Sequence, residues 1–258
     1  MNKQTVAVLD FGSQYTQLIA RRIREQNVYS EILPHTITAE ELNKKNVPAI
    51  ILSGGPSSVY DKNAPQVDPS ILSMGIPVLG ICYGLQLMIT QNGGNVTHKG
   101  QGEYGFAKMH TVNESPLLTN LANESQVWMS HGDEIDSLGN GFEIIAQSSN
   151  DVIAAIHHKD QPLYGVQFHP EVIHTLEGET IISNFLFNIA QCTADWTAAN
   201  FISETISKIQ DITGDNGKVI TGLSGGVDSS VVGTLLHKAI GTRSTCVFID
   251  HGLLRKNE

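Results

Sequence analysis

The chain has 258 residues, 40% of them hydrophobic and 16% charged, which is enough for one large or two ordinary domains, and we expect two. Its formal net charge of −10 argues against sequence-independent binding to nucleic acid or anionic lipid, because such binding depends on clustered Lys and Arg. The sequence contains no apolar run of about 18 residues that could span a membrane, and its N-terminus lacks a signal-peptide pattern. We therefore expect a cytoplasmic protein that acts on small molecules.

The N-terminal part of the chain repeats a pattern of strand, turn and helix. A β-branched run from Thr5 to Leu9 precedes the turn DFGS and then apolar residues at helical spacing. The cycle returns with a strand at 28–33, a short helix at 39–45, strands at 49–53 and 76–81, and a helix after Cys82. Strands that alternate with helices imply right-handed crossovers and a parallel sheet covered on both faces.

From about residue 96 to residue 167 the pattern changes to short alternating segments, such as EIIAQSS and LYGVQF, broken by Gly, Asn and Asp. These segments predict antiparallel strands added to the parallel core. A helix at about 179–190 closes this first domain, to which we assign residues 1–192. The predicted fold class is therefore α/β, with a mostly parallel sheet, flanking helices and added antiparallel strands.

Residues 193–258 contain a linker helix, which ends near Ile212, and the N-terminal part of a second α/β domain. The strand KVIT, the turn GLSGGVDSS, a helix and the strand TCVFID follow one another there. Two strands of a parallel sheet bury little apolar area, so we expect partial exposure and weaker protection from about residue 200 onward. The strand residues to which this applies are Val219, Ile220, Val247 and Phe248.

Cys82 lies between an apolar run and a helix, inside the frame Gly80-x-Cys82-x-Gly84. A buried cysteine is often only a small core residue. The chain's cysteines show no CxxC or metal-ligand spacing, which argues against a disulfide framework or a zinc site. A strand that bends sharply into a helix is the geometry of a nucleophile elbow. There the helix N-terminus lowers the thiol pKa, and the amide of Tyr83 can donate to an oxyanion.

A base for such a nucleophile is offered by GVQFHPE at 165–171, where His169 follows a strand and Glu171 can orient its imidazole. A histidine before proline can equally be a surface loop residue. A second oxyanion donor could come from SGGP at 53–56, although a plain tight turn would have the same sequence. The stretch WMSHGDEID at 128–136 could be only a hydrophilic loop.

The segments SGGP, GICYGLQ and HPE, in this order within residues 5–190, resemble the class I (triad) glutamine amidotransferases, which have a flavodoxin-like fold. The resemblance implies that Cys82 is the nucleophile, His169 the base and then the acid, and Glu171 its orienting partner. It implies an oxyanion hole at the amides of Gly55 and Tyr83. It also implies that glutamine is bound by Gln86 and by the backbone around Ser130, Gly132 and Asp133. No cofactor is expected for this half.

The turn GLSGGVDSS at 222–230 follows a strand and precedes a helix, so its amides and hydroxyls could cradle phosphate. A Gly/Ser turn without function is the alternative. The pattern lacks GK[ST] and resembles the PP-loop of ATP pyrophosphatases, which cut ATP to AMP and pyrophosphate. The resemblance implies a magnesium contact at Asp228, with no other metal ligand expected, and ATP contacts at Ser224, Gly225, Gly226, Val227, Asp228, Ser229 and Ser230.

The combination of both halves, with LDFGSQYTQLIARRIRE at 9–25 and FIDHGLLRKNE at 248–258, resembles the glutamine-hydrolysing GMP synthases. That family uses ATP and Mg²⁺ to adenylate xanthosine 5′-monophosphate, which ammonia from glutamine converts to GMP. Relative to that family, the sequence ends within the ATP domain. We therefore expect a complete glutaminase, half an ATP site, and a homodimer formed through a C-terminal domain outside this sequence.

Other functions remain open. A γ-glutamyl hydrolase or stand-alone glutaminase would have the same fold but no use for SGGVDSS. A non-enzymatic binding module would not require the Cys, His and Glu set. Asparagine and NAD synthetases also combine a glutaminase with a PP-loop, but their glutaminase halves belong to different folds.

Overall fold

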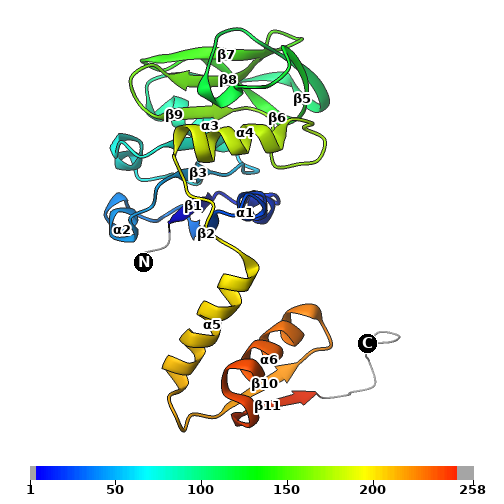
Figure 1. The fold of residues 1–258 in the computed structure, drawn as a ribbon. Helices are drawn as coiled ribbons and strands as arrows, with labels where there is room; N and C mark the ends of the chain where they lie inside the picture. The colour runs from blue at the N-terminus through cyan, green and yellow to red at the C-terminus, as the bar shows by residue number, and fades with distance from the viewer. Residues whose placement is uncertain (1–3, 249–258) are drawn as a thin grey trace. The chain divides into compact units, whose positions relative to one another are not determined.

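The structure is a computed structural model that describes residues 4–248, and at 99–101 only the backbone. The chain divides into two compact units, Met1–Asp195 and Trp196–Glu258, and each is described by itself (Figure 1). Within residues 4–248, none of the helices has both the length and the apolar character needed to cross a membrane.

The first unit is built on a nine-stranded sheet with the order β2-β1-β3-β4-β9-β8-β7-β5-β6. Its parallel part consists of β1 (Thr5–Asp10), β2 (Tyr29–Pro34), β3 (Ile50–Leu52), β4 (Val78–Ile81) and β9 (Leu163–Val166). The antiparallel part consists of β5 (Asn95–Thr111), β6 (Glu124–Ser137), β7 (Phe142–Ser148) and β8 (Ile153–His158). The predicted fold class is confirmed.

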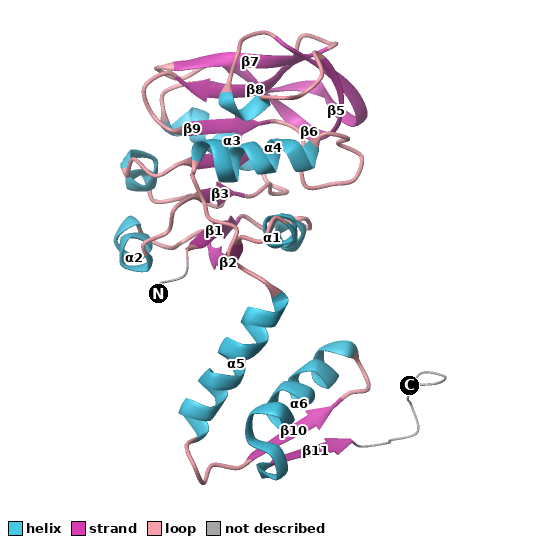
Figure 2. Ribbon diagram, in the orientation of Figure 1, coloured by secondary structure: helices cyan, strands magenta, loops and turns pink. Residues whose placement is uncertain are grey.

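Helices cover both faces of the parallel strands (Figure 2). Alternate residues of β1 point to opposite sides, so Val8 belongs to the buried cluster that contains Ile19, while Leu9 belongs to the cluster that contains Leu42. Each large apolar side chain buried in this way stabilises the fold by about 1.5–3 kcal/mol. The helical segments are α1 (Thr16–Glu25), α2 (Ala39–Lys45), η1 (Pro69–Ser73), α3 (Tyr83–Gln91), η2 (Pro116–Leu118), α4 (Gly178–Ser183) and η3 (Asn184–Ile189).

Two details differ from the sequence prediction. β5 and β6 are not short, because they span 17 and 14 residues and pair along most of their length, with an irregularity between His98 and Glu103. The glycines within β5 hide the alternation that would reveal so long a strand. The helix predicted at about 179–190 changes from an α-helix to a π-helix at Asn184. The side-chain amide of Asn184 donates to the carbonyls of Leu117 and Thr119.

The second unit contains α5 (Ala198–Thr213), β10 (Val219–Leu223), α6 (Val227–Ile240), η4 (Gly241–Arg243) and β11 (Ser244–Phe248), and its two strands are parallel. Its buried residues, within the part that the structure describes, are Gly233, Ala239 and Ile240. Ile220 is 77% exposed, and Val247 and Phe248 are 41% and 45% exposed. The predicted exposure of these strand residues is confirmed, and Val219 is half-buried.

Candidate active site

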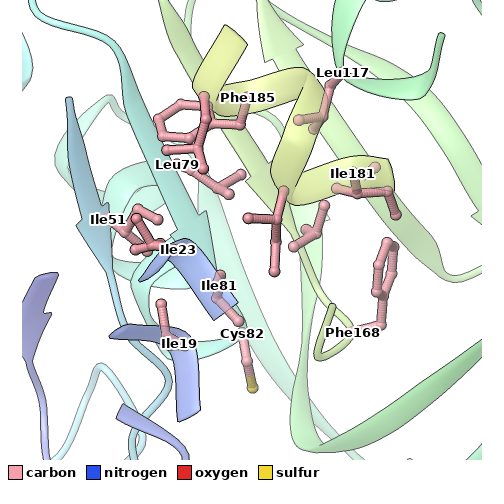
Figure 3. Packing of buried hydrophobic residues seen from close by; sticks show 14 of the residues in the cluster. Ile19, Ile23, Ile51, Leu79, Ile81, Cys82, Leu117, Phe168, Ile181 and Phe185 are labelled. Carbon is pink, nitrogen blue, oxygen red and sulfur yellow. The ribbon is translucent and has the colours of Figure 1, made fainter. Parts of the chain in front are cut away.

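Cys82 stands at the turn between β4 and α3 with φ 50° and ψ −104°, a backbone conformation that residues with a Cβ rarely adopt. Two backbone hydrogen bonds hold it there: its N–H donates to Val166 O at 2.8 Å, and its carbonyl accepts from Gln86 N at 3.1 Å. In Figure 3 the sulfur points away from the core side chains of Leu79 and Phe185. The turn has the strained geometry expected of a nucleophile elbow.

Gly80 and Gly84 are required by the close approach of α3 to the sheet. A Cβ placed on Gly80 would lie 2.7 Å from Leu85 N, and one placed on Gly84 would overlap the backbone of Leu52. Both contacts are closer than real side chains tolerate. The glycines therefore let the helix begin directly above the strand ends, and the turn between them borders the cavity.

His169 and Glu171 form a buried pair beside this turn. Nδ1 of His169 lies 2.8 Å from Oε1 of Glu171, which is fully buried. The segment is anchored because His169 N donates to Trp128 O at 3.0 Å and Thr175 Oγ1 donates to His169 O at 2.6 Å. The ring of Tyr15 meets the imidazole edge-on, with centroids 5.2 Å apart.

The protonated form of His169 is favoured. Burial is the largest single influence and lowers the pKa of His169, but the hydrogen bonds to Cys82 and Glu171, together with their charges, outweigh it and raise that pKa to about 10. The imidazolium is therefore the resting form at neutral pH. A proton is available on the ring before any substrate binds.

These groups open into a cavity of about 700 Å³, within the range usual for small-molecule sites. It lies at the carboxyl ends of parallel strands, where open α/β sheets bind ligands. Its lining residues are Gly12, Ser13, Gln14, Tyr15, Gly55, Pro56, Ser57, Ser58, Cys82, Tyr83, Gln86, His98, Tyr104, Ser130, His131, Gly132, Asp133 and His169.

The two amides named for the oxyanion hole both belong to cavity-lining residues, Gly55 and Tyr83. Tyr83 is in the first turn of α3, where backbone N–H groups have no acceptor within the helix. Its side chain is engaged elsewhere, because the hydroxyl donates to Pro65 O at 2.6 Å and burial raises its pKa to about 12. Only the backbone of Tyr83 is therefore available to a ligand.

The residues named for glutamine binding also converge on the cavity, and 128–136 lies in β6 rather than in a hydrophilic loop. Gln86 Nε2 donates to Asp133 O at 2.9 Å, and Cys82 Sγ donates to Ser130 O at 3.7 Å. Asp133 Oδ1 lies 2.9 Å from Nδ1 of His98. Several of these polar groups thus bond to one another, in addition to lining the cavity.

The sequence analysis did not identify Gln167, which lies fully buried against the sulfur of Cys82. β9 ends at Val166 and Gln167 lies in the bend that follows, so no strand pattern in the sequence marked this residue. Tyr15, His98 and Tyr104 were not identified from the sequence either, because their positions depend on contacts between distant segments.

The predicted phosphate loop lies at the N-terminus of α6, with Gly226 as the N-cap and Gly225 at φ +83°. Ser224 N donates to Ser229 Oγ at 3.2 Å, and Ser230 Oγ donates to Gly226 O at 3.0 Å. The loop thus gathers hydroxyls around the positive end of a helix dipole, which suits a phosphate. No cluster of three or more His, Cys, Asp or Glu side chains suited to a metal ion is found among the described residues.

Each of the two units of the chain matches a known protein family. Residues 7–189 match the family Glutamine amidotransferase class-I, and residues 197–251 match the family NAD synthase. A "GMP synthase [glutamine-hydrolyzing]" from Listeria innocua is 56% identical over 99% of this chain and 49% of its own length. The protein of the same name from Thermosynechococcus vestitus is 51% identical over 100% of this chain and 48% of its own. The chain spans about half the length of the curated relatives it matches.

Solved structures agree with the first unit. A candidate GMP synthase component from Thermoplasma acidophilum is 29% identical, with a TM-score of 0.66, covering 78% of this chain and 98% of that one. A glutamine amidotransferase from Thermotoga maritima shares the fold with a TM-score of 0.59 at 18% identity, covering 73% of this chain and 98% of that one. The family match covers residues 7–189, which include the strained turn at Cys82 and the His169–Glu171 pair. The chain therefore belongs to the class-I glutamine amidotransferase family.

Proposed function

We propose that this chain hydrolyses the side-chain amide of glutamine, with Cys82 as nucleophile, His169 as proton carrier and Glu171 as its orienting partner. The observation that carries the proposal is the strained turn at Cys82, which places the sulfur in a cavity beside a buried imidazole already paired with a carboxylate. A cysteine that served only to fill the core would need neither the strain nor the pair. Residues 1–192 form the glutaminase domain in this proposal.

In the first half-reaction the proton of Cys82 is held by His169, and the thiolate sulfur attacks the amide carbon of glutamine, forming a C–S bond while the C=O electron pair moves onto oxygen. The backbone amides of Gly55 and Tyr83 donate to that oxygen. The imidazolium of His169 then gives its proton to the amide nitrogen, the C–N bond breaks, and ammonia leaves a thioester behind. The raised pKa of His169 suits this order because the proton is in place at neutral pH.

In the second half-reaction the neutral His169 takes a proton from water as the water oxygen attacks the thioester carbon. The C–S bond breaks, the sulfur leaves as thiolate, and glutamate is released. The imidazolium and thiolate are thereby restored, and one glutamine and one water have become one glutamate and one ammonia. Glu171 keeps Nδ1 occupied throughout, so that Nε2 alone exchanges protons.

For the whole protein we propose glutamine-hydrolysing GMP synthesis, in which the ammonia aminates ATP-activated xanthosine 5′-monophosphate and GMP, AMP and pyrophosphate are the products. The full-chain similarity to proteins of that name supports this. Residues 193–258 supply the linker and the start of the ATP domain. ATP would be held at Ser224–Ser230, with magnesium at Asp228 balancing phosphate charge. The three free cysteines and the acidic composition support a cytoplasmic enzyme without nucleic-acid partners, and we place dimerisation outside this sequence.

A second acceptor is raised by the NAD synthase match over residues 197–251. That match covers only the ATP unit, whereas the relatives from Listeria innocua and Thermosynechococcus vestitus, which match both units, carry the name GMP synthase. A glutaminase that uses no acceptor would leave the loop at 224–230 without a role. Amination of xanthosine monophosphate is therefore the function that both units support together.

The test is to incubate the complete protein with glutamine, ATP and magnesium, and to follow glutamate and GMP with and without xanthosine monophosphate. We expect glutamate release to accompany GMP formation, and ammonium salts to replace glutamine. Equal glutamate release with no GMP would reject the acceptor and keep the glutaminase. The absence of both, with the protein folded, would reject the proposal as a whole.

A further inference from the structure

We infer that Gln167 is a positioning residue for the nucleophile: its side-chain amide donates a hydrogen bond to the sulfur of Cys82 and holds the thiolate form in place for attack. The inference rests on the proposed role of Cys82 and goes beyond the Cys82, His169 and Glu171 set. It concerns a residue whose position is decided by the sheet and not by its sequence neighbours.

Gln167 follows β9 directly, and β9 is the parallel neighbour of β4, so the residue after one strand lies beside the residue after the other. The backbone is tied at this point, because Cys82 N donates to Val166 O and Gln167 N donates to Ala154 O, each at 2.8 Å. Gln167 is fully buried, and its Nε2 lies 3.6 Å from Cys82 Sγ.

The orientation of the Gln167 amide follows from its neighbours. Asp133 O can only accept, so the group of Gln86 that lies 2.9 Å from it must be the NH₂. The same NH₂ lies 3.3 Å from Gln167, which must therefore present its carbonyl oxygen there. That leaves the NH₂ of Gln167 to face the sulfur. A backbone carbonyl on β6 thus fixes, through two amides, a donor aimed at Cys82.

The groups around the sulfur make this donor useful. Ser130 O, 3.7 Å from the sulfur, can accept from the thiol but would repel a thiolate. His169, with Glu171 behind it, supplies the positive charge. His131 also lines the cavity, and because burial lowers its pKa it stays neutral at neutral pH. The other titratable residues that line the cavity are Tyr15, Tyr83, His98, Tyr104 and Asp133. Gln167 is thus a neutral donor that favours the thiolate from a second side.

A hydrogen bond to a charged sulfur should be visible in the titration of Cys82. The test is alkylation of the complete protein by iodoacetamide across a pH series, with the labelled Cys82 peptide quantified by mass spectrometry. Gln167→Met keeps the length of the side chain and removes the donor. We expect the alkylation midpoint of Cys82 to rise by about one pH unit, the scale of a charge-assisted hydrogen bond. We also expect kcat for glutamine to fall about 10-fold with KM little changed, since the change acts on the nucleophile.

The chain offers two controls. Cys246 is exposed and far in sequence from the cavity, so its alkylation profile in the same samples should not move. Asn184→Leu removes another buried amide, which donates to the carbonyls of Leu117 and Thr119 and accepts from Asn188 Nδ2, and should lower stability without moving the Cys82 midpoint. If Gln167→Met does not fold, Gln167→Glu carries the test. Its carboxylate should raise the midpoint further than the loss of the donor does.

An unchanged Cys82 midpoint in folded Gln167→Met or Gln167→Glu would overturn the inference, whatever the activity. A second outcome is possible, in which the Cys82 midpoint changes in Gln167→Met but the Cys82→Ala variant still hydrolyses glutamine. That outcome would keep the hydrogen bond and reject the proposed function. The two failures are therefore distinguishable.

Discussion

Nδ1 of His169 lies 2.8 Å from Oε1 of Glu171, so that two side chains on either side of one proline face each other in the interior. Pro170 and Glu171 lie in a turn, and the ring of Pro170 restricts the backbone between the two side chains. The pair is thus built locally and then buried by the surrounding strands.

The first prediction concerns the pair itself. His169→Ala leaves the sulfur without a proton partner and should lower the glutaminase rate by roughly 10² to 10⁴-fold. Glu171→Ala should lower it less, because the imidazole remains. Steady-state release of glutamate measures both. The matched control is His157→Ala, which removes a histidine that pairs with Glu143 and lies outside the cavity lining. A larger loss from His157→Ala than from His169→Ala would place the base elsewhere.

The second separates the two half-reactions of the complete protein. Cys82→Ala should abolish glutamine-dependent synthesis and leave synthesis from ammonium salts intact, because the sulfur takes no part in amination of the acceptor. Product formation from each nitrogen source is the measurement. Cys192→Ala, a change at a buried cysteine outside the cavity, should keep both rates if the variant folds. Loss of the ammonia-dependent rate in folded Cys82→Ala would make Cys82 a structural residue.

The third concerns pH. The pKa of His169 is raised from 6.5 to about 10 in the folded protein, so between these values the folded state binds more protons than the unfolded state. Its contribution to stability is fully present below about pH 6.5 and is lost as the pH rises through about 10. Denaturant titrations over this range should show a smaller decline in the free energy of unfolding for His169→Gln than for the parent. Parallel curves for both proteins would contradict the raised pKa.

The fourth tests the elbow. Gly84→Ala places a methyl group on the backbone of Leu52 and should destabilise the protein by about 1–3 kcal/mol or more, the scale of an overpacked core. The control is Gly75→Ala, because Gly75 has φ +71° and nothing within 4 Å of an added Cβ. It should show only the backbone penalty of about 1–2 kcal/mol. Thermal or denaturant unfolding measures both, and a variant at Gly84 as stable as the parent would show that α3 can shift away from the sheet.

The fold and the sharp turn at Cys82 were largely readable from the sequence because each rests on local signals. Alternating strands and helices determine which faces are apolar, and the frame Gly80-x-Cys82-x-Gly84 indicates that the chain must turn sharply at one residue. The lengths of β5 and β6 were not readable, because glycines interrupt the period-two pattern of β5 and polar residues such as His131 and Asp133 occupy buried positions of β6. The pairing between the two strands sustains them.

The sequence by itself determined the strained turn, the His169–Glu171 spacing and the Gly/Ser loop before α6, since each needs only residues a few positions apart. The tertiary structure alone decided that Gln167 lies against Cys82, 85 positions away, and that β6 supplies carbonyls at Ser130 and Asp133. The physical reason is that the order of strands in the sheet brings such residues together. Strand order depends on the packing of both faces over the whole unit, which no short segment specifies.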